Sequence, residues 1–298
     1  MTRKASLGRA APWILLAFPL LLVGLLLVLP YLVTFYYAVT DAKISALTNP
    51  RLIGLGNFKA ILDSHAPPFV GVLSVTVVFT LGTMLGSLAL GTGLALALHT
   101  LGRGKRAILT AIFLIPWVVA GVIIGYTWRL MYDPAIGLAN TLLAGVGLGP
   151  ISWLTDRATA IASLIVANIW ASYGIVLLIM TAALANLPPN LVLSGQVDGA
   201  SYRRIVWRII LPAVRPSFLL AGLVALVSGL NVFDLIYVMT GGGPVYQTET
   251  LALNMFRITQ KRGDVGQGAA LTVILFSFSL ILAIAYVIVW RREARKWS

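Results

Sequence analysis

The chain has 298 residues, of which 59% are hydrophobic and 10% charged, with no cysteine and a formal net charge of +13. Its mean hydropathy of +0.94 is far above that of a soluble domain, and the absence of cysteine excludes a disulfide framework and thiol chemistry. The basic residues lie at the ends of apolar runs, where they set the orientation of the spans in the membrane. This distribution argues against a nucleic-acid partner.

Six apolar runs follow one another, at about 13–38, 70–98, 108–131, 158–186, 217–239 and 268–290. A helix needs about 20 apolar residues to cross the hydrocarbon core of a membrane. The chain is therefore predicted to be an all-α polytopic membrane protein, with one transmembrane domain over residues 1–298 and six transmembrane helices. The first run continues to about Ala38 without a small-residue cleavage site, so we interpret it as a retained span and not as a signal peptide.

Lysine and arginine are unevenly divided between the two sides of this arrangement. If the N-terminus is cytoplasmic, 14 of the 22 basic residues lie on the cytoplasmic side, in the two tails and two connections. The positive-inside rule then predicts that both termini are cytoplasmic.

The connection at about 187–216 is polar and stands between two long apolar runs. Asp198 is a candidate N-cap for a helix over Ser201–Leu211 that ends at Pro212. One face of this helix is apolar and the opposite arc is basic: Tyr202, Ile205, Val206, Ile209 and Ile210 against Arg203, Arg204 and Arg208. Such a helix could lie on the membrane surface with its arginines at lipid phosphates. Gly195 and Gly199 instead favour two short angled helices, which a groove in a partner protein could hold.

Three motifs resemble one known family, and together they cover nearly the whole chain. Asp198-Gly199-Ala200-Ser201, followed by Ile209, Leu211-Pro212 and Pro216, resembles the EAA coupling loop of binding-protein-dependent ABC importer permeases. Gly54-Leu55-Gly56-Asn57-Phe58 is similar to the G-L-x-N-F of the sugar branch, and FDLIYVMTGGGP at 233–244 is similar to its F-D-x-I-Y-x-x-T-x-G-G-P. The resemblance points to the maltose- and glycerol-phosphate-type permeases, and to the first of their two paired subunits.

One departure from the family pattern lies in the coupling loop. The positions of the family's Glu-Ala-Ala are occupied by Leu193, Ser194 and Gly195. Either the partner permease supplies the stronger contact with the ATPase, or this interface is tuned differently.

The chain carries no motif of its own for catalysis or metal binding. Gly102-Arg103-Gly104-Lys105 lacks the spacing of a P-loop, and His65 and His99 have no metal-ligand neighbours in the sequence. We therefore expect a transport subunit that is not an enzyme and that holds no cofactor, with ATP and Mg bound by a partner ATPase.

Polar and aromatic residues in the fourth and fifth runs predict a substrate path, because polar groups inside a membrane usually face a cavity or the bundle interior. Asn231, Asp234 and Tyr237 recur every three residues and would share one helix face. The full candidate set is Asn168, Trp170, Tyr173, Ser228, Asn231, Asp234 and Tyr237. Amide and carboxylate groups would bond sugar hydroxyls, and aromatic rings would stack on pyranose faces. Alternatively, Asn168 and Asn231 bond between helices, and Asp234 has a structural role.

The resemblance implies a type I ABC importer permease fold and a multi-pass protein of a prokaryotic inner or plasma membrane. It implies a second permease, two ATPase subunits, an extracytoplasmic binding protein and a sugar, with an oligosaccharide or disaccharide expected. The residues expected to couple to the ATPase are Asp198, Gly199, Ala200, Ser201, Tyr202, Arg203, Ile205, Val206, Ile209 and Pro212. The alternatives are an ion-coupled secondary transporter and a membrane scaffold that binds anionic lipid; neither would need an ATPase.

Overall fold

A computed structural model describes residues 16–197 and 199–294 and divides them into two compact units. One unit contains residues up to 64 together with 255–276, and the other contains residues 65–254 together with those from 277 onward. The described residues form helices, with isolated β-bridges in place of any strand, and this confirms the all-α prediction. The assignment of one domain stays a prediction.

Within the described residues, four helices are long and apolar enough to cross a membrane. They are Leu16–Ala38, which ends in α2 (Leu29–Ala38), then α4 (Phe69–His99), α8 (Arg157–Ala185), and Val265–Val289 within α15 (Val265–Ala294). Two bent pairs of helices raise the number to six if each pair is one span. One pair is α5 (Arg103–Val118) with α6 (Gly121–Met131), bent by 90°, and the other is residues 202–213 with α12 (Arg215–Leu230), bent by 73°.

The third predicted span is therefore not one straight helix. Pro116 lies inside α5, and the chain becomes extended at Val119 and Ala120 before α6 begins at Gly121. Proline removes a backbone donor and its ring crowds the preceding turn, so a helix commonly breaks near it. The apolar pattern of 108–131 runs unchanged through this break and could not reveal it.

The fifth predicted span also differs from the expected continuous helix over 217–239. α12 ends at Leu230, and a separate helix, α13 (Asp234–Met239), begins three residues after Asn231 closes it. The Asn231 side chain donates to the Val227 carbonyl at 2.8 Å, and its backbone N–H donates to Ser228 at 3.1 Å. Asparagine competes in this way with helical bonding of the backbone and favours a helix end.

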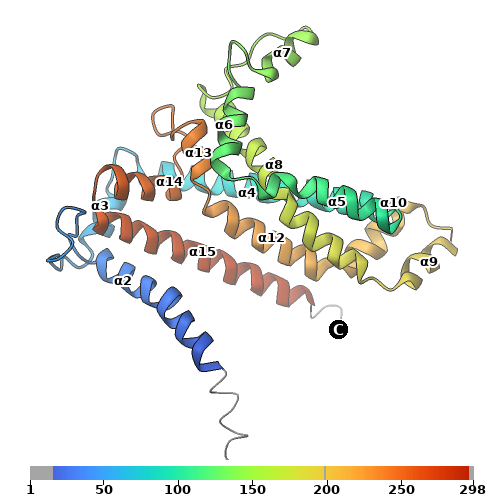
Figure 1. Cartoon of the computed structure of the whole chain (residues 1–298), viewed down its shortest axis with the longest axis horizontal. Coiled ribbons are helices and arrows are strands. Elements are labelled where there is room, and N and C mark those ends of the chain that lie inside the picture. Colours follow the sequence, from blue (N-terminus) through green and yellow to red (C-terminus); the bar gives the residue numbers. More distant parts are fainter. Residues whose placement is uncertain (1–15, 198, 295–298) are drawn as a thin grey trace, which may run out of the picture. The chain divides into compact units, whose positions relative to one another are not determined.

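Helices α4, α8 and α12 form the centre of the second unit, with α5 packed along α8 and α13 packed against α6 (Figure 1). Three glycines on α4 lie where a Cβ atom would meet α8 side chains: Gly82 at Ile165, Gly86 at Ile169 and Gly91 at Val176, at 2.8, 2.1 and 2.7 Å. Small residues let membrane helices approach closely and gain packing contacts, and these three glycines permit the close packing of α4 on α8.

The remaining elements of the second unit lie at the ends of these long helices. α7 (Leu138–Gly145) extends away from them beyond α6, whereas α9 (Pro189–Val197) and α10 (Tyr202–Ile205) lie at the other end (Figure 1). η2 (Val206–Ile210) and α11 (Leu211–Ala213) continue α10. In the chain, α14 (Leu251–Phe256) and η3 (Arg257–Lys261) precede α15; α14 begins in the second unit, and η3 belongs to the first.

In the first unit, the Asn57 side chain is hydrogen-bonded to backbone carbonyls at and just after the end of α2. It lies on α3 (Gly56–Leu62), and its Nδ2 donates to the Ala38 carbonyl at 2.9 Å and to the Thr40 carbonyl at 2.7 Å. Carbonyls at a helix C-terminus lack intrahelical donors, so a buried amide there satisfies them. The motif at 54–58 thus has a structural role in this unit.

Candidate functional site

The coupling segment, which we define as residues 189–213, consists of two short helices joined by a tight turn. α9 forms the first helix; α10, η2 and α11 form a continuous second helix, with which α9 is in contact. Gly195 lies at their crossing, where a Cβ atom would be 2.8 Å from Ile209 Cδ1. The expected pair of short helices is present, and glycine at the crossing permits their close approach.

Gly199 ends the first helix of the coupling segment and does not open the second. Its φ is +69°, its N–H donates to Gln196, and the N–H of Ala200 donates to Gly195, both at 3.0 Å. This bonding is the Schellman arrangement, which favours glycine. Ser201 occupies the N-cap position of the second helix, without a side-chain bond to it. The predicted N-cap, Asp198, lies outside the described residues.

The second helix has a buried apolar face and an exposed basic face, as its sequence predicts, except that Tyr202 of the predicted apolar face is exposed. Ile205 and Ile210 are 2% and 1% exposed, and with Val206 they pack into a core that includes Leu184. Arg203, Arg204 and Arg208 are exposed, and so is Tyr202. The apolar face therefore packs on the protein itself, which disfavours the alternative of a helix lying with this face in lipid.

Pro212 does not end the second helix, contrary to the prediction. The helix widens into a π turn at Val206–Ile210, where the N–H of Leu211 donates to the carbonyl of Val206. It continues to Ala213 and bends by 73° into α12. The wider turn accommodates a ring that an ordinary α-helical turn would exclude, since π bulges change the spacing between donors and carbonyls.

α9 presents exposed apolar side chains, although it lies outside the residues expected to couple to the ATPase, Asp198 to Pro212. Val197 is 87% exposed and Leu193 is 53% exposed, whereas Gly195 is buried against the second helix. An exposed apolar side chain such as Val197, on a segment that also exposes arginines, is typical of a protein-binding surface. The apolar residues of α9 follow no helical period, and therefore the sequence carried no signal for this exposure.

The substrate-path candidates on α8 divide into buried and exposed residues. Tyr173 is buried and belongs to the core beside the coupling segment, so its side chain faces protein and not an open path. Asn168 is also buried, and its Nδ2 has no hydrogen-bond partner among the described residues. Trp170 is exposed and lies edge-to-face with Trp128 of α6, with ring centroids 6.1 Å apart.

The break after α12 separates the candidates that were expected on one helix face. Ser228 and Asn231 belong to the end of α12, whereas Asp234 and Tyr237 belong to α13, so the predicted three-residue repeat does not form. Ser228, Asn231 and Tyr237 are exposed in this unit, and Asp234 is partly buried.

The Asp234 carboxylate faces the start of α6. Its Oδ1 accepts the Leu235 N–H at 2.9 Å, and a Cβ atom on Gly121 would lie 2.1 Å from its Oδ2. A negative charge is favourable at the N-terminus of a helix. A second contact joins the same two helices, because Arg129 Nη1 donates to the Val238 carbonyl at 3.1 Å. This geometry supports the structural role considered for Asp234.

Metal-ligating side chains do not gather at this site. Within the described part of the chain, no group of three or more His, Cys, Asp or Glu residues is placed to hold an ion.

The family follows from comparison with known proteins. Residues 2–295 match the family described as "Binding-protein-dependent transport system inner membrane component". The trehalose/maltose transport system permease protein MalF of Thermococcus litoralis is 32% identical over 292 residues, which cover 98% of this chain and 97% of that protein. The sulfoquinovosyl glycerol transport system permease protein SmoG of Agrobacterium fabrum is also 32% identical, over 98% of this chain and 94% of that one.

A solved structure gives the same answer for the fold. A chain of the bacterial alginate ABC transporter, in complex with an alginate pentasaccharide-bound periplasmic protein, matches with a TM-score of 0.80 and 21% identity over 98% of both chains. The predicted ABC importer permease fold and family are therefore confirmed: the chain belongs to the inner membrane components of binding-protein-dependent transport systems.

Proposed function

We propose that the chain is a permease subunit of an ATP-driven importer that moves a sugar from an extracytoplasmic binding protein into the cytoplasm. In this proposal it pairs with a second permease, and two ATPase subunits bind ATP and Mg on their own surfaces. The relatives whose names mention trehalose, maltose or sulfoquinovosyl glycerol match nearly the whole chain, and this supports a sugar as the transported compound.

The coupling segment is the observation that carries the proposal. Its inner face is fixed in the core of α4 and α8, and its outer face presents α9 and three exposed arginines. A short connection joins α8 to α9, and a single bend at Val214 joins the second helix to α12. A partner that moves this segment would therefore move the ends of α8 and α12 with it. Such coupling is a shared equilibrium between two conformations that both ligands bias.

The placement of the connections supports a cytoplasmic location for the coupling segment. The end of α4, the start of α5 and α9 line one cavity, and the C-terminal half of α15 lies beside Pro216 at the start of α12. The start of α5, the second helix of the coupling segment and the end of α15 are basic in sequence, with Arg103, Lys105 and Arg106, Arg203, Arg204 and Arg208, and Arg291 and Arg292. The positive-inside rule assigns these basic parts to the cytoplasm, with both termini.

The chemistry of the exposed path candidates favours a neutral saccharide. Ser228 and Asn231 offer a hydroxyl and an amide, and Trp170 and Tyr237 offer rings for stacking on a sugar. The seven candidates include one carboxylate and no cation. An anionic sugar would need a cationic or donor-rich partner, because burying an unpaired charge is costly. A neutral disaccharide or oligosaccharide fits this set.

Retention of the ATPase by α9 provides the test. Val197→Asp places a charge on the most exposed large hydrophobic residue of the coupling segment. Val146→Asp is the matched control, since Val146 is 73% exposed at the end of α7, at the other end of the unit. Loss of one buried apolar contact at an interface weakens binding by about tenfold or more. We expect Val197→Asp to reduce the ATPase that co-purifies with the membrane-inserted chain, and Val146→Asp to retain it.

Equal retention by both variants would refute docking at α9. Failure of the wild-type chain to co-purify with any ATPase would instead favour the ion-coupled transporter or the scaffold. In the reconstituted importer, binding-protein-dependent ATPase stimulation should respond to neutral di- and trisaccharides and not to sugar phosphates. The reverse preference would overturn the assignment of a neutral substrate.

A further inference from the structure

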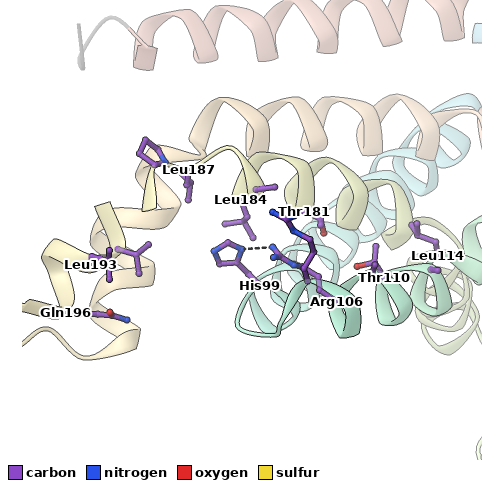
Figure 2. Close-up of a pocket in the computed structure, with 15 residues that line it drawn as sticks. His99, Arg106, Thr110, Leu114, Thr181, Leu184, Leu187, Leu193 and Gln196 are labelled. Atoms are coloured by element: carbon purple, nitrogen blue, oxygen red, sulfur yellow. Dashed lines mark hydrogen bonds between the residues drawn. The ribbon is translucent and has the colours of Figure 1, made fainter. Parts of the chain in front are cut away.

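A cavity of about 820 Å³ lies between the α4–α5 connection and α9, behind the coupling segment. Figure 2 shows His99 and Arg106 facing each other at its centre, with Leu193 and Gln196 of α9 on one side. Arg103 also lines it, from the first residue of α5. None of these three basic residues belongs to the proposed substrate path or to the outer face of the coupling segment.

The cavity carries positive charge without a counterion among the described residues. Arg106 Nη1 lies 3.3 Å from His99 Nδ1, and since arginine can only donate, His99 accepts through Nδ1 and is neutral. The described lining residues include two arginines and no carboxylate. The N-terminus of α5 adds partial positive charge, because its first turn has no acidic residue and its N-cap, Gly102, makes no side-chain bond. An anion would be stabilised at this end of the cavity.

The rest of the cavity is mainly apolar, which determines what kind of anion fits. Its walls are formed largely by aliphatic side chains, among them Leu114, Leu184, Leu187, Val192 and Leu193. Two wall residues, Thr110 and Thr181, have buried hydroxyls with no hydrogen-bond partner among the described residues. A small side-chain rotation would let them bond to oxygen atoms of an occupant. A cation pair beside aliphatic walls matches a phosphate group attached to a hydrocarbon chain.

We propose that this cavity binds the phosphate group of an anionic phospholipid, with Arg103 and Arg106 on the phosphate and an acyl chain along the leucine wall. Arginine holds phosphate through two parallel hydrogen bonds, and basic pockets between membrane helices on the cytoplasmic side are suited to lipid headgroups. The bound lipid connects the α4–α5 connection with α9. It would therefore stabilise the position of α9 against the start of α5. This structural role is separate from the import of a substrate.

The test measures lipid retained by the purified, delipidated importer complex in native mass spectrometry, after addition of phosphatidylglycerol or phosphatidylcholine. The test variants are Arg103→Gln with Arg106→Gln, and Arg106→Lys, which keeps the charge but not the paired donors. Lys105→Gln is the matched control, because Lys105 lies on the same helical turn, is exposed and does not line the cavity. Thermal unfolding of each variant separates loss of the site from loss of the fold.

We expect phosphatidylglycerol, and not phosphatidylcholine, to bind wild type and Lys105→Gln with equal affinity. The affinity should fall about tenfold or more in the double variant, with a smaller loss in Arg106→Lys. Inorganic phosphate that displaces the lipid and binds equally well alone would identify the occupant as free phosphate, and the lipid assignment would be wrong. Unchanged phosphatidylglycerol binding in a folded double variant would overturn the site. Binding to the isolated chain but not to the assembled complex would show that a partner protein fills the cavity, which also overturns it.

Discussion

The contact between Gly121 and Asp234 joins α6 to α13, and Gly121→Ala tests whether it holds the two broken helices together. A Cβ atom at Gly121 would lie 2.1 Å from Asp234 Oδ2, 2.7 Å from Cγ and 2.9 Å from Oδ1, whereas ordinary contacts are 3.4–4 Å. Since Cγ is among the close atoms, rotation of the carboxylate in place cannot relieve the clash. The whole side chain must turn away, and it then loses the Leu235 N–H and its place at the start of α6.

These losses set the size of the effect. Overpacking a tight site costs about 1–3 kcal/mol, and a hydrogen bond to a charged group contributes about 1.5–3 kcal/mol. We expect Gly121→Ala to lower the free energy of unfolding by about 2–4 kcal/mol, and Asp234→Ala by about 1.5–3 kcal/mol. The double variant should lose no more than Asp234→Ala, because the new methyl group then has nothing to displace.

The assay is unfolding of the full chain in detergent, followed by tryptophan fluorescence, for both single variants and the double variant. Gly93→Ala is the control, because Gly93 also lies in an apolar helix but nothing lies within 4 Å of its Cβ position. Alanine there should be neutral or stabilising by about 0.5–1 kcal/mol, since glycine weakens a helix interior. A stable Gly121→Ala variant, or a double variant whose loss is the sum of the two single losses, would refute the reasoning.

Four other substitutions, one of them a control, test the packing and hydrogen bonds described above. Ile210→Ala empties a site in the core and should cost about 2–5 kcal/mol of unfolding free energy, whereas Arg204→Ala on the exposed arc of the same helix should stay within about 0.5 kcal/mol; equal losses would contradict the two-faced packing. Gly199→Ala forces a residue with a Cβ atom to the φ of +69° and should cost about 1–2 kcal/mol, measured by the same unfolding assay, and unchanged stability would exclude the Schellman turn. Asn57→Ala leaves the Ala38 and Thr40 carbonyls without their side-chain donor and should cost about 1–3 kcal/mol. It should also speed amide hydrogen exchange at the end of α2. Unchanged exchange there would contradict a stabilising role for the Asn57 hydrogen bonds.

The coupling segment shows which structural features a local sequence pattern can predict. The pattern of isoleucines and arginines over 202–210 predicts an amphipathic helix, and the structure confirms it except at Tyr202, which is exposed and not buried. Its ends were predicted less well. Gly199 closes the first helix with a Schellman turn that the sequence pattern does not specify, and a π turn carries the second helix past Pro212, where the sequence predicts its end. Bonding at helix ends depends on backbone angles that residue type biases but does not decide.

For the substrate path, the sequence predicted the grouping of the candidate residues incorrectly. The three-residue spacing of Asn231, Asp234 and Tyr237 predicts one face of one helix, but Asn231 ends α12 and Asp234 starts α13. Tyr173 has the chemistry of a sugar contact, yet it is buried in the core. Residue chemistry states what a side chain can bind, and only its neighbours in space decide whether a ligand can reach it.

The sequence by itself determined the solvent and the class of this protein. Apolar runs of span length require a membrane and an all-α fold, because backbone groups in lipid must be satisfied within the segment. Three motifs with specific spacing carried the family. Tertiary structure alone decided where two of the spans break, that α9 is the exposed part of the coupling segment, and that Arg103 and Arg106 share a cavity with α9. Hydropathy is a property of each segment, whereas breaks, exposure and cavities arise from packing between segments far apart in the chain.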